Sequence, residues 1–149
     1  MEGLLATALH VTMNLKMNDE KQQAAQQRKV LCIEDERFIS ELYVRALKKA
    51  GYQVDVAVDG QKALEEAQSD KYDIILLDIM IPTISGIDVL KKLRDPAATP
   101  NLRAKIIVTT NLDQGEEARA EIEKQADGYI IKADATPRQL VEFLDELKL

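Results

Sequence analysis

The chain has 149 residues, a length that suits one globular domain with a hydrophobic core of its own. Hydrophobic residues make up 46% of it and charged residues 31%, which is ordinary for a soluble protein and argues against wholesale disorder. The net charge of −6, without a dense basic patch, predicts no direct nucleic-acid binding.

The chain contains one cysteine and no long apolar run. Cys32 excludes an internal disulfide, which favours a reducing compartment, and its place in the apolar run Val30–Ile33 predicts a buried structural thiol. Residues 3–9 are faintly signal-like, but no basic residue precedes them and no convincing cleavage site comes after them. No stretch approaches the ~20 apolar residues of a membrane span. We therefore expect a cytoplasmic protein without membrane insertion.

Residues 1–28 differ in composition from the rest of the chain. The segment 16–28 is polar and rich in Gln and Ala, without a sustained core-facing pattern, so a frayed helix and a disordered tail both remain open. Met13 and Met17 leave a later translation start open as well. We therefore divide the chain into an N-terminal extension, residues 1–28, flexible or partly helical, and a domain at residues 29–149.

From residue 29 onward, short apolar runs alternate with stretches of helical periodicity. Runs that are separated by helices predict parallel strands with crossover connections. Near-continuous Val, Ile and Leu is typical of strands that are covered on both faces. The predicted strands are Val30–Ile33, Val54–Val58, Ile74–Leu77, Ile106–Thr109 and Tyr129–Ile131.

The helices between these strands are indicated by periodic apolar residues and by residues that can cap the helix ends. Apolar residues from Phe38 to Leu47 form a core-facing stripe, and Gly51 can end that helix. Thr136 can cap a final helix that has Pro137 in its first turn and runs to about residue 147. The other predicted helices cover about 61–69, 86–94 and 113–125, the last of them opened by Asp113.

Together these elements predict an α/β fold, a doubly wound (βα)5 sheet. Right-handed crossovers place helices on both faces, and the flavodoxin-like order 2-1-3-4-5 is the commonest for five parallel strands of this kind. In such a sheet the functional site lies at the carboxyl ends of the strands, where the order reverses between the first and third strands.

Chemically active side chains stand at those strand ends. Glu34 and Asp35 follow the first strand and Asp78 follows the third, so three carboxylates should converge within a few ångströms. Their repulsion is best answered by a hard cation with oxygen ligands, such as Mg²⁺. Lys132 adds a positive charge and Thr110 a neutral hydroxyl. This combination suits phosphoryl transfer onto a carboxylate.

With these residues in place, the chain resembles the response-regulator receiver family of two-component signalling over residues 29–148. The run Val30–Glu36 is similar to that family's first strand with its acidic pair. Asp78–Pro82, followed by Gly86, resembles the D-x-x-x-P-x-x-x-G signature around the phosphoacceptor. Gly128–Lys132 resembles the fifth strand with its switch aromatic and lysine. The motifs occur in the right order at the right strand ends, which makes the match specific.

The resemblance implies a role for each strand-end residue. Asp78 would accept a phosphoryl group from a sensor histidine kinase or a phosphotransfer protein. Mg²⁺ would be held by Asp78, by Asp35 directly, by Glu34 largely through water, and by the backbone carbonyl of Met80. Lys132 would pair with a phosphoryl oxygen. The chain is not expected to be an enzyme beyond catalysing its own aspartyl phosphorylation and dephosphorylation.

The resemblance also implies a switch. Thr110, rather than Thr109, would bond the phosphoryl group, because an ungapped count back from Lys132 aligns it with the family's switch hydroxyl. Tyr129 would then rotate from exposed to buried and remodel the surface of the domain's fourth helix, fifth strand and fifth helix. That surface would control a downstream protein target that the sequence does not identify. Since the chain ends soon after the final helix, we expect a stand-alone receiver without an output domain, although a fragment of a longer regulator would look the same.

Several positions depart from the family pattern. Asn111 follows the switch hydroxyl where a small residue is usual, which could alter access to the phosphoryl group. Ala133 follows Lys132 in place of a proline, which favours a trans peptide bond. Met80 and Leu112 are apolar and cannot orient an attacking water, so we expect slow self-dephosphorylation.

Two other functions fit the same fold. A phosphorylation-independent interaction module would keep the receiver fold without the switch, but such modules usually lack one or more of the strand-end residues. A metal-dependent phosphatase would use similar carboxylate chemistry, but it needs a general acid or base near the nucleophile, and Ile79 to Ile81 are inert. Glu36, by comparison, is most simply interpreted as an acidic residue at a helix start.

Overall fold

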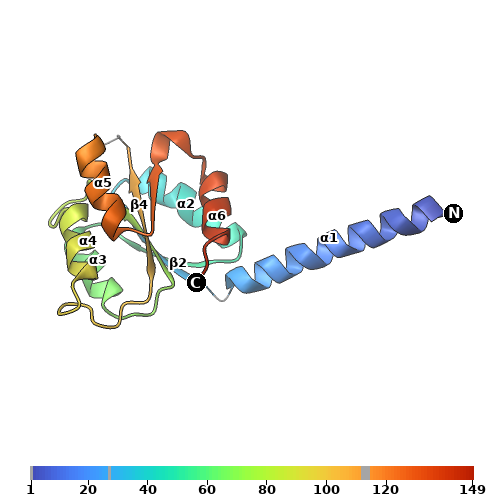
Figure 1. The fold of residues 1–149 in the computed structure, drawn as a ribbon, viewed down its shortest axis with the longest axis horizontal. Coiled ribbons are helices and arrows are strands. Elements are labelled where there is room, and N and C mark those ends of the chain that lie inside the picture. The colour runs from blue at the N-terminus through green and yellow to red at the C-terminus, as the bar shows by residue number, and fades with distance from the viewer. Residues whose placement is uncertain (1, 27, 112–114) are drawn as a thin grey trace.

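The computed structural model describes residues 2–26, 28–111 and 115–149. Five parallel strands form one sheet in the order β2-β1-β3-β4-β5, which confirms the predicted doubly wound topology (Figure 1). The strands are β1 Lys29–Ile33, β2 Gln53–Ala57, β3 Ile74–Asp78, β4 Lys105–Thr110 and β5 Gly128–Ile131. The helices are α1 Glu2–Gln26, α2 Arg37–Lys49, α3 Gly60–Ala67, α4 Gly86–Arg94, α5 Glu116–Gln125 and α6 Pro137–Asp145, with a short 3-10 turn, η1, at Lys132–Asp134.

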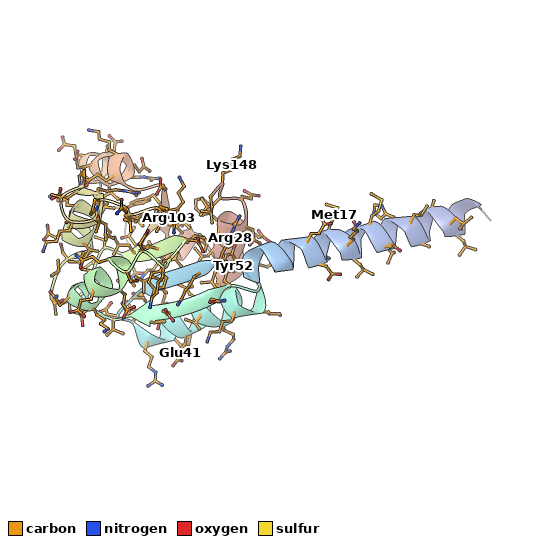
Figure 2. All side chains as sticks on the ribbon, turned by 90° about the horizontal axis from the view of Figure 1, so that it is seen from below. Met17, Arg28, Glu41, Tyr52, Arg103 and Lys148 are labelled. Atoms are coloured by element: carbon orange, nitrogen blue, oxygen red, sulfur yellow. The ribbon has the colours of Figure 1, made fainter. Side chains whose placement is uncertain are left out.

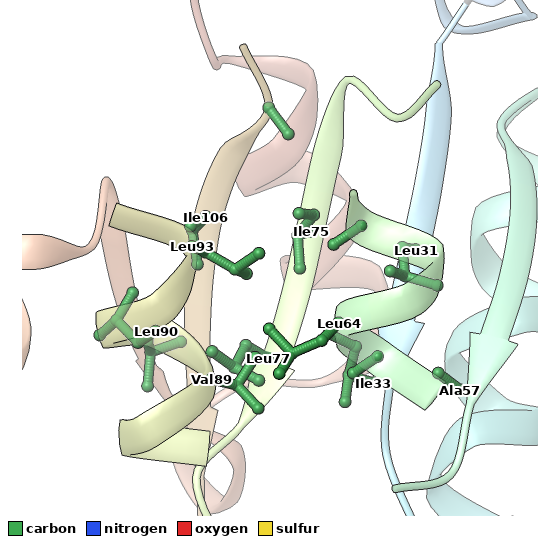
Figure 3. Close-up of a cluster of buried hydrophobic side chains, with 14 of the residues drawn as sticks. Leu31, Ile33, Ala57, Leu64, Ile75, Leu77, Val89, Leu90, Leu93 and Ile106 are labelled. Carbon is green, nitrogen blue, oxygen red and sulfur yellow. The ribbon is translucent and has the colours of Figure 1, made fainter. Parts of the chain in front are cut away.

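Side chains of β3 alternate between two hydrophobic cores, one on each face of the sheet. Ile75 and Leu77 belong to the core beneath α3, α4 and α5, part of which is drawn in Figure 3. Ile74 and Leu76 belong to the core beneath α2 and α6. Because both faces are covered, β3 is buried along its whole length, and its last residue can be a buried carboxylate.

Two expectations about burial are wrong. β2 is an edge strand and is only partly covered, so that Val56 is 42% exposed. Phe38 does not join the core-facing stripe of α2; it lies in the first turn and is 72% exposed. The stripe itself is real, since Tyr43 and Leu47 of the same helix are buried.

The predicted caps at two helix ends are present. Gly51 follows α2 with a φ of 99°, a left-handed conformation that glycine adopts without strain. The hydroxyl of Thr136 accepts a hydrogen bond from the Gln139 amide, and the Gln139 side chain accepts one from the Thr136 amide, so α6 opens with a full capping box. The predicted cap Asp113 lies outside the described residues, and α5 begins at Glu116.

Helix α1 projects away from the domain (Figure 1), and the side chains that are drawn along it have no other element of the chain beside them (Figure 2). Its residues 3–20 are exposed. Within the described part of the chain, no helix is long and apolar enough to cross a membrane. Just after α1, Arg28 donates a hydrogen bond to the Leu144 carbonyl at 3.4 Å, which ties the start of the domain to α6. The exposed large apolar residues of α1 are Leu4, Leu5, Leu9, Val11, Met13, Leu15 and Met17.

Candidate functional site

Three carboxylates meet at the carboxyl ends of β1 and β3. The two strands pair in parallel with Ile33 opposite Leu77, so the residues that come after β1 lie beside the end of β3. One carboxylate oxygen from each of Glu34, Asp35 and Asp78 lies within 4.8 Å of the others. Glu34 and Asp78 are buried, whereas Asp35 is exposed. The structure thus brings together the acidic residues that the sequence singled out.

Lys132 lies between two of these carboxylates. It is the first residue after β5, its backbone forms the turn η1, and its side chain is buried. The ammonium group donates to Oδ2 of Asp78 at 3.0 Å and also to Oε1 of Glu34. The sequence placed Lys132 near Asp78, but nothing in it indicated that the lysine also bonds Glu34.

The protonation of this cluster depends on its burial. The pKa of Glu34 is raised to about 8, mainly by burial and also by its contact with Asp78, while the bond from Lys132 acts in the opposite direction. Burial alone would lower the pKa of Lys132, but its bonds to Glu34 and Asp78 more than offset this, so its pKa is raised. The cluster therefore favours a charged Lys132, and Glu34 gives up its proton less readily than an ordinary glutamate.

The donor set fits a hard divalent cation. Among the described residues, Oε2 of Glu34 is a buried oxygen without a hydrogen-bond partner. A buried polar atom without a partner is costly, and a cation beside it would supply the missing interaction. The three clustered residues all offer oxygen ligands, which Mg²⁺ prefers, and the exposed Asp35 leaves one side of the cluster open to solvent.

The backbone after β3 orients the Asp78 carboxylate. The Met80 amide donates to Oδ1 of Asp78 at 3.1 Å, while the Met80 side chain is 66% exposed beside the site. Oδ1 and Oδ2 are thus held by different groups, the amide and the Lys132 ammonium. Leu112, the other apolar residue predicted beside the phosphoryl group, lies outside the described residues.

The structure shows why the signature that begins at Asp78 contains a glycine, Gly86. A Cβ atom on this residue would lie 2.2 Å from the carbonyl oxygen of Asp78 and 2.5 Å from the Cα of Ile79, both of them backbone atoms. The amide of Gly86 also donates to the Ile79 carbonyl at 2.9 Å. The start of α4 therefore packs directly on the backbone of the central acidic residue, and this contact requires a residue without a side chain.

The predicted switch residues lie on β4 and β5. Thr110 is the last residue of β4 and is buried, as is Thr109, which is the residue paired with Asp78. Tyr129 is half-buried, and its ring packs against the core beneath α3, α4 and α5. The guanidinium of Arg119 on α5 lies 4.8 Å from the centre of that ring, a cation–π contact that no spacing in the sequence indicated.

The loop after β5 differs from the family pattern as predicted. Throughout the described residues every peptide bond is trans, including the one between Lys132 and Ala133. The chain continues through η1 to Ala135, whose amide bonds the Lys132 carbonyl at 3.5 Å. The lysine therefore reaches the acidic cluster without a cis bond after it.

A five-stranded doubly wound domain with acidic residues and a lysine at its strand ends has the architecture of a phosphoacceptor domain. The family model of the response regulator receiver domain matches residues 30–145. The chain therefore belongs to the response-regulator receiver family of two-component signalling systems.

The relatives agree with this assignment. Response regulator ArlR of Staphylococcus saprophyticus is 36% identical over 104 residues, which cover 70% of this chain and 45% of that protein. ArlR of Staphylococcus aureus is also 36% identical, over 103 residues that cover 69% of this chain and 45% of the relative. The chain thus spans about half the length of the curated relatives that it matches.

Solved structures show the same fold. The receiver domain of the Francisella response regulator 1452 superposes with a TM-score of 0.70 at 29% identity, covering 79% of this chain and 93% of that one. Chemotaxis protein CheY4 of Vibrio cholerae gives 0.69 at 27% identity, with 82% and 99% covered. Response regulator TrrA of Thermotoga maritima, solved in complex with Mg²⁺-BeF, gives 0.60 at 34% identity, with 70% and 86% covered.

Proposed function

We propose that this receiver accepts a phosphoryl group on Asp78 from a phosphohistidine of a sensor histidine kinase or a phosphotransfer protein. The observation that carries the proposal is the environment of Asp78. Its carboxylate is buried at the end of β3, is bonded by the Lys132 ammonium and the Met80 amide, and lies beside Glu34 and Asp35. Such an environment orients the carboxylate and places the Lys132 cation where it can pair with a phosphoryl oxygen.

The transfer would use the carboxylate of Asp78 as the nucleophile. One Asp78 oxygen forms a bond to phosphorus while the P–N bond to the donor histidine breaks, and the electron pair of that bond stays on the imidazole nitrogen. Lys132 would pair with a phosphoryl oxygen, and the Thr110 hydroxyl would donate to another. The chain would catalyse only this reaction and the hydrolysis of its own acyl phosphate.

Glu34, Asp35, Asp78 and the backbone carbonyl of Met80 would hold Mg²⁺. When bound, this ion neutralises charge on the transferred phosphoryl group. The unpartnered Oε2 of Glu34 supports the assignment, and so does the similarity to TrrA, whose solved complex contains Mg²⁺-BeF.

The phosphoryl group would then change the surface of α5, β5 and α6. A bond to Thr110 would draw the end of β4 inward, and Tyr129 would move deeper into the space beside α5. The contact between Arg119 and the Tyr129 ring links this aromatic residue to α5. The altered surface would control a partner protein.

Incubation with a small phosphodonor tests the proposal. The protein is treated with Mg²⁺ and either acetyl phosphate or phosphoramidate, whose P–N bond resembles that of phosphohistidine, and intact masses are compared. We expect an adduct of about 80 Da on the wild type, since one phosphoryl group adds that mass. Asp78→Asn should show none, whereas the matched control Asp88→Asn, at an exposed aspartate of α4, should behave like the wild type. An adduct that persists on Asp78→Asn would reject Asp78 as the acceptor.

A further inference from the structure

Two exposed polar side chains meet above the end of β3. Asn111 is the first residue after β4, and its side-chain amide donates a hydrogen bond to Oε1 of Glu36 at 3.4 Å. Glu36 is the third residue after β1 and precedes α2. Because β3 lies between β1 and β4 in the sheet, a bond between residues that come after those two strands crosses the carboxyl end of β3. Asp78 is the residue at that end.

The side chains of Asn111 and Glu36, joined by their hydrogen bond, reach across the end of β3. Neighbouring strands lie about 4.8 Å apart, so the two residues reach across roughly 10 Å of sheet edge. Glu36 occupies the N-cap position of α2, but its side chain makes no capping hydrogen bond to the helix. Its carboxylate points across the sheet edge to Asn111. A small residue in place of Asn111 could not make this bond, and the link across the end of β3 would be lost.

We propose that the Glu36–Asn111 bridge is a gate over the phosphoacceptor that controls how often donors and water reach Asp78. The inference builds on the proposed function. The two residues are gating residues that do not react themselves; when their bond breaks, both side chains can turn into solvent, since both are exposed. The gate therefore opens without any rearrangement of the sheet.

A gate of this kind acts equally on both reactions of Asp78. In phosphorylation, an Asp78 oxygen bonds to phosphorus as the P–O bond to acetate breaks, and acetate leaves with the electron pair. In hydrolysis, the oxygen of water bonds to phosphorus as the acyl phosphate P–O bond breaks, which restores the carboxylate and gives inorganic phosphate and a proton. In both reactions the entering or leaving group lies opposite Asp78 on the line of attack, so both need the space above β3.

The expected effect is modest because the bond is long and exposed. A long hydrogen bond that is exposed to water is as weak as an exposed ion pair, and it favours the closed gate by a factor of roughly two to five. Loss of the bond should therefore raise the rate of phosphorylation by acetyl phosphate and the rate of phosphate release by the same factor, roughly two- to fivefold. The fraction of protein phosphorylated at steady state should not change.

A double-mutant cycle tests the gate. Glu36→Ala, Asn111→Ala and the double variant are compared with the wild type, with phosphorylation followed by intact mass and hydrolysis by release of inorganic phosphate. Each single variant should accelerate both rates, and the double variant should be no faster than the faster single variant. Glu36→Gln keeps an oxygen that can accept from Asn111, so it should restore the slow rates. Asn101→Ala, at an exposed asparagine in the loop before β4, is the matched control.

The outcomes separate the gate from the proposed function. If the wild type acquires no adduct, the proposed function itself fails. If the wild type is phosphorylated but the single variants keep its rates, the gate is overturned. It is also overturned if the effects of the two variants multiply, or if only one of the two rates changes. Urea midpoints that match the wild type would show that the variants are folded.

Discussion

Lys132→Met removes the only cation that bonds the buried carboxylates of Glu34 and Asp78 within the described residues. A buried hydrogen bond to a charged group contributes about 1.5–3 kcal/mol to stability, and two such bonds are lost. Protonation of one carboxylate and the packing of the Met side chain recover part of this. We expect a net loss of about 3 kcal/mol, near the lower end for a broken buried ion pair.

Urea unfolding in EDTA measures this loss. The four tyrosines all lie within the domain and the chain has no tryptophan, so tyrosine fluorescence follows the unfolding of the domain alone. With a slope of about 2 kcal/mol per molar urea, the midpoint should fall by about 1.5 M. Lys124→Met is the control, because its ammonium lies 3.6 Å from Glu121 on the exposed surface of α5, where a pair contributes little.

The loss of stability caused by Lys132→Met should depend on pH. The folded pKa of Glu34, about 8, lies above its ordinary value of 4.5, so its protonation contributes stability that is full below pH 4.5 and is lost as the pH rises through 8. The bond from Lys132 lowers the pKa of Glu34, so in the Lys132→Met variant the deprotonation of Glu34 in the folded state costs more free energy than in the wild type. The variant should therefore lose more relative to the wild type near pH 9 than near pH 6. A midpoint within about 0.3 M of the wild type at both pH values would refute the reasoning.

Three further predictions concern other residues of the domain. Gly86→Ala should lower the free energy of unfolding in urea by about 2 kcal/mol, because its Cβ would meet the Asp78 backbone at 2.2 Å. Gly3→Ala, whose Cβ would have nothing within 4 Å, should not lower it, and equal urea midpoints of the two variants would contradict the prediction. Binding of Mg²⁺ should compete with the proton on Glu34, whose pKa is raised to about 8. The association constant for Mg²⁺, measured by calorimetric titration, should therefore rise with pH by up to about tenfold per pH unit below about pH 8. An association constant that does not depend on pH would contradict this prediction. Burial raises the pKa of Cys32 to about 12, so iodoacetamide should label it only after unfolding in urea, and rapid labelling of the native protein would contradict its burial.

The topology could be predicted from the sequence because each strand is a short apolar run with helical signals on both sides. The capping box at Thr136 and the glycine after α2 show how local chemistry fixes helix ends. The exposure of Phe38 and Val56 could not be predicted in the same way. Both residues look like core residues in the sequence, and their exposure depends on where the helix begins and which strand lies at the sheet edge.

The sequence also predicted which residues meet at the candidate site, but not every contact between their side chains. Strand order alone brings Glu34, Asp35 and Asp78 together, since residues at the ends of neighbouring parallel strands share one edge of the sheet. Contacts between single side chains of different segments leave no periodic pattern in the sequence. The bond between Asn111 and Glu36 joins residues 75 positions apart, and the position of the Arg119 guanidinium over its tyrosine ring depends on a side-chain rotamer. Such contacts require coordinates.

Helix α1 has a thermodynamic consequence of its own. It stands clear of the sheet, so its helical state depends on local propensity and is not supported by the two cores (Figure 1). An isolated helix of this kind melts gradually, by fraying from its ends, while the domain unfolds in one cooperative transition. Circular dichroism at the helix band would thus show a sloping loss of signal before the main transition, and amide hydrogen exchange along α1 would be orders of magnitude faster than in β3.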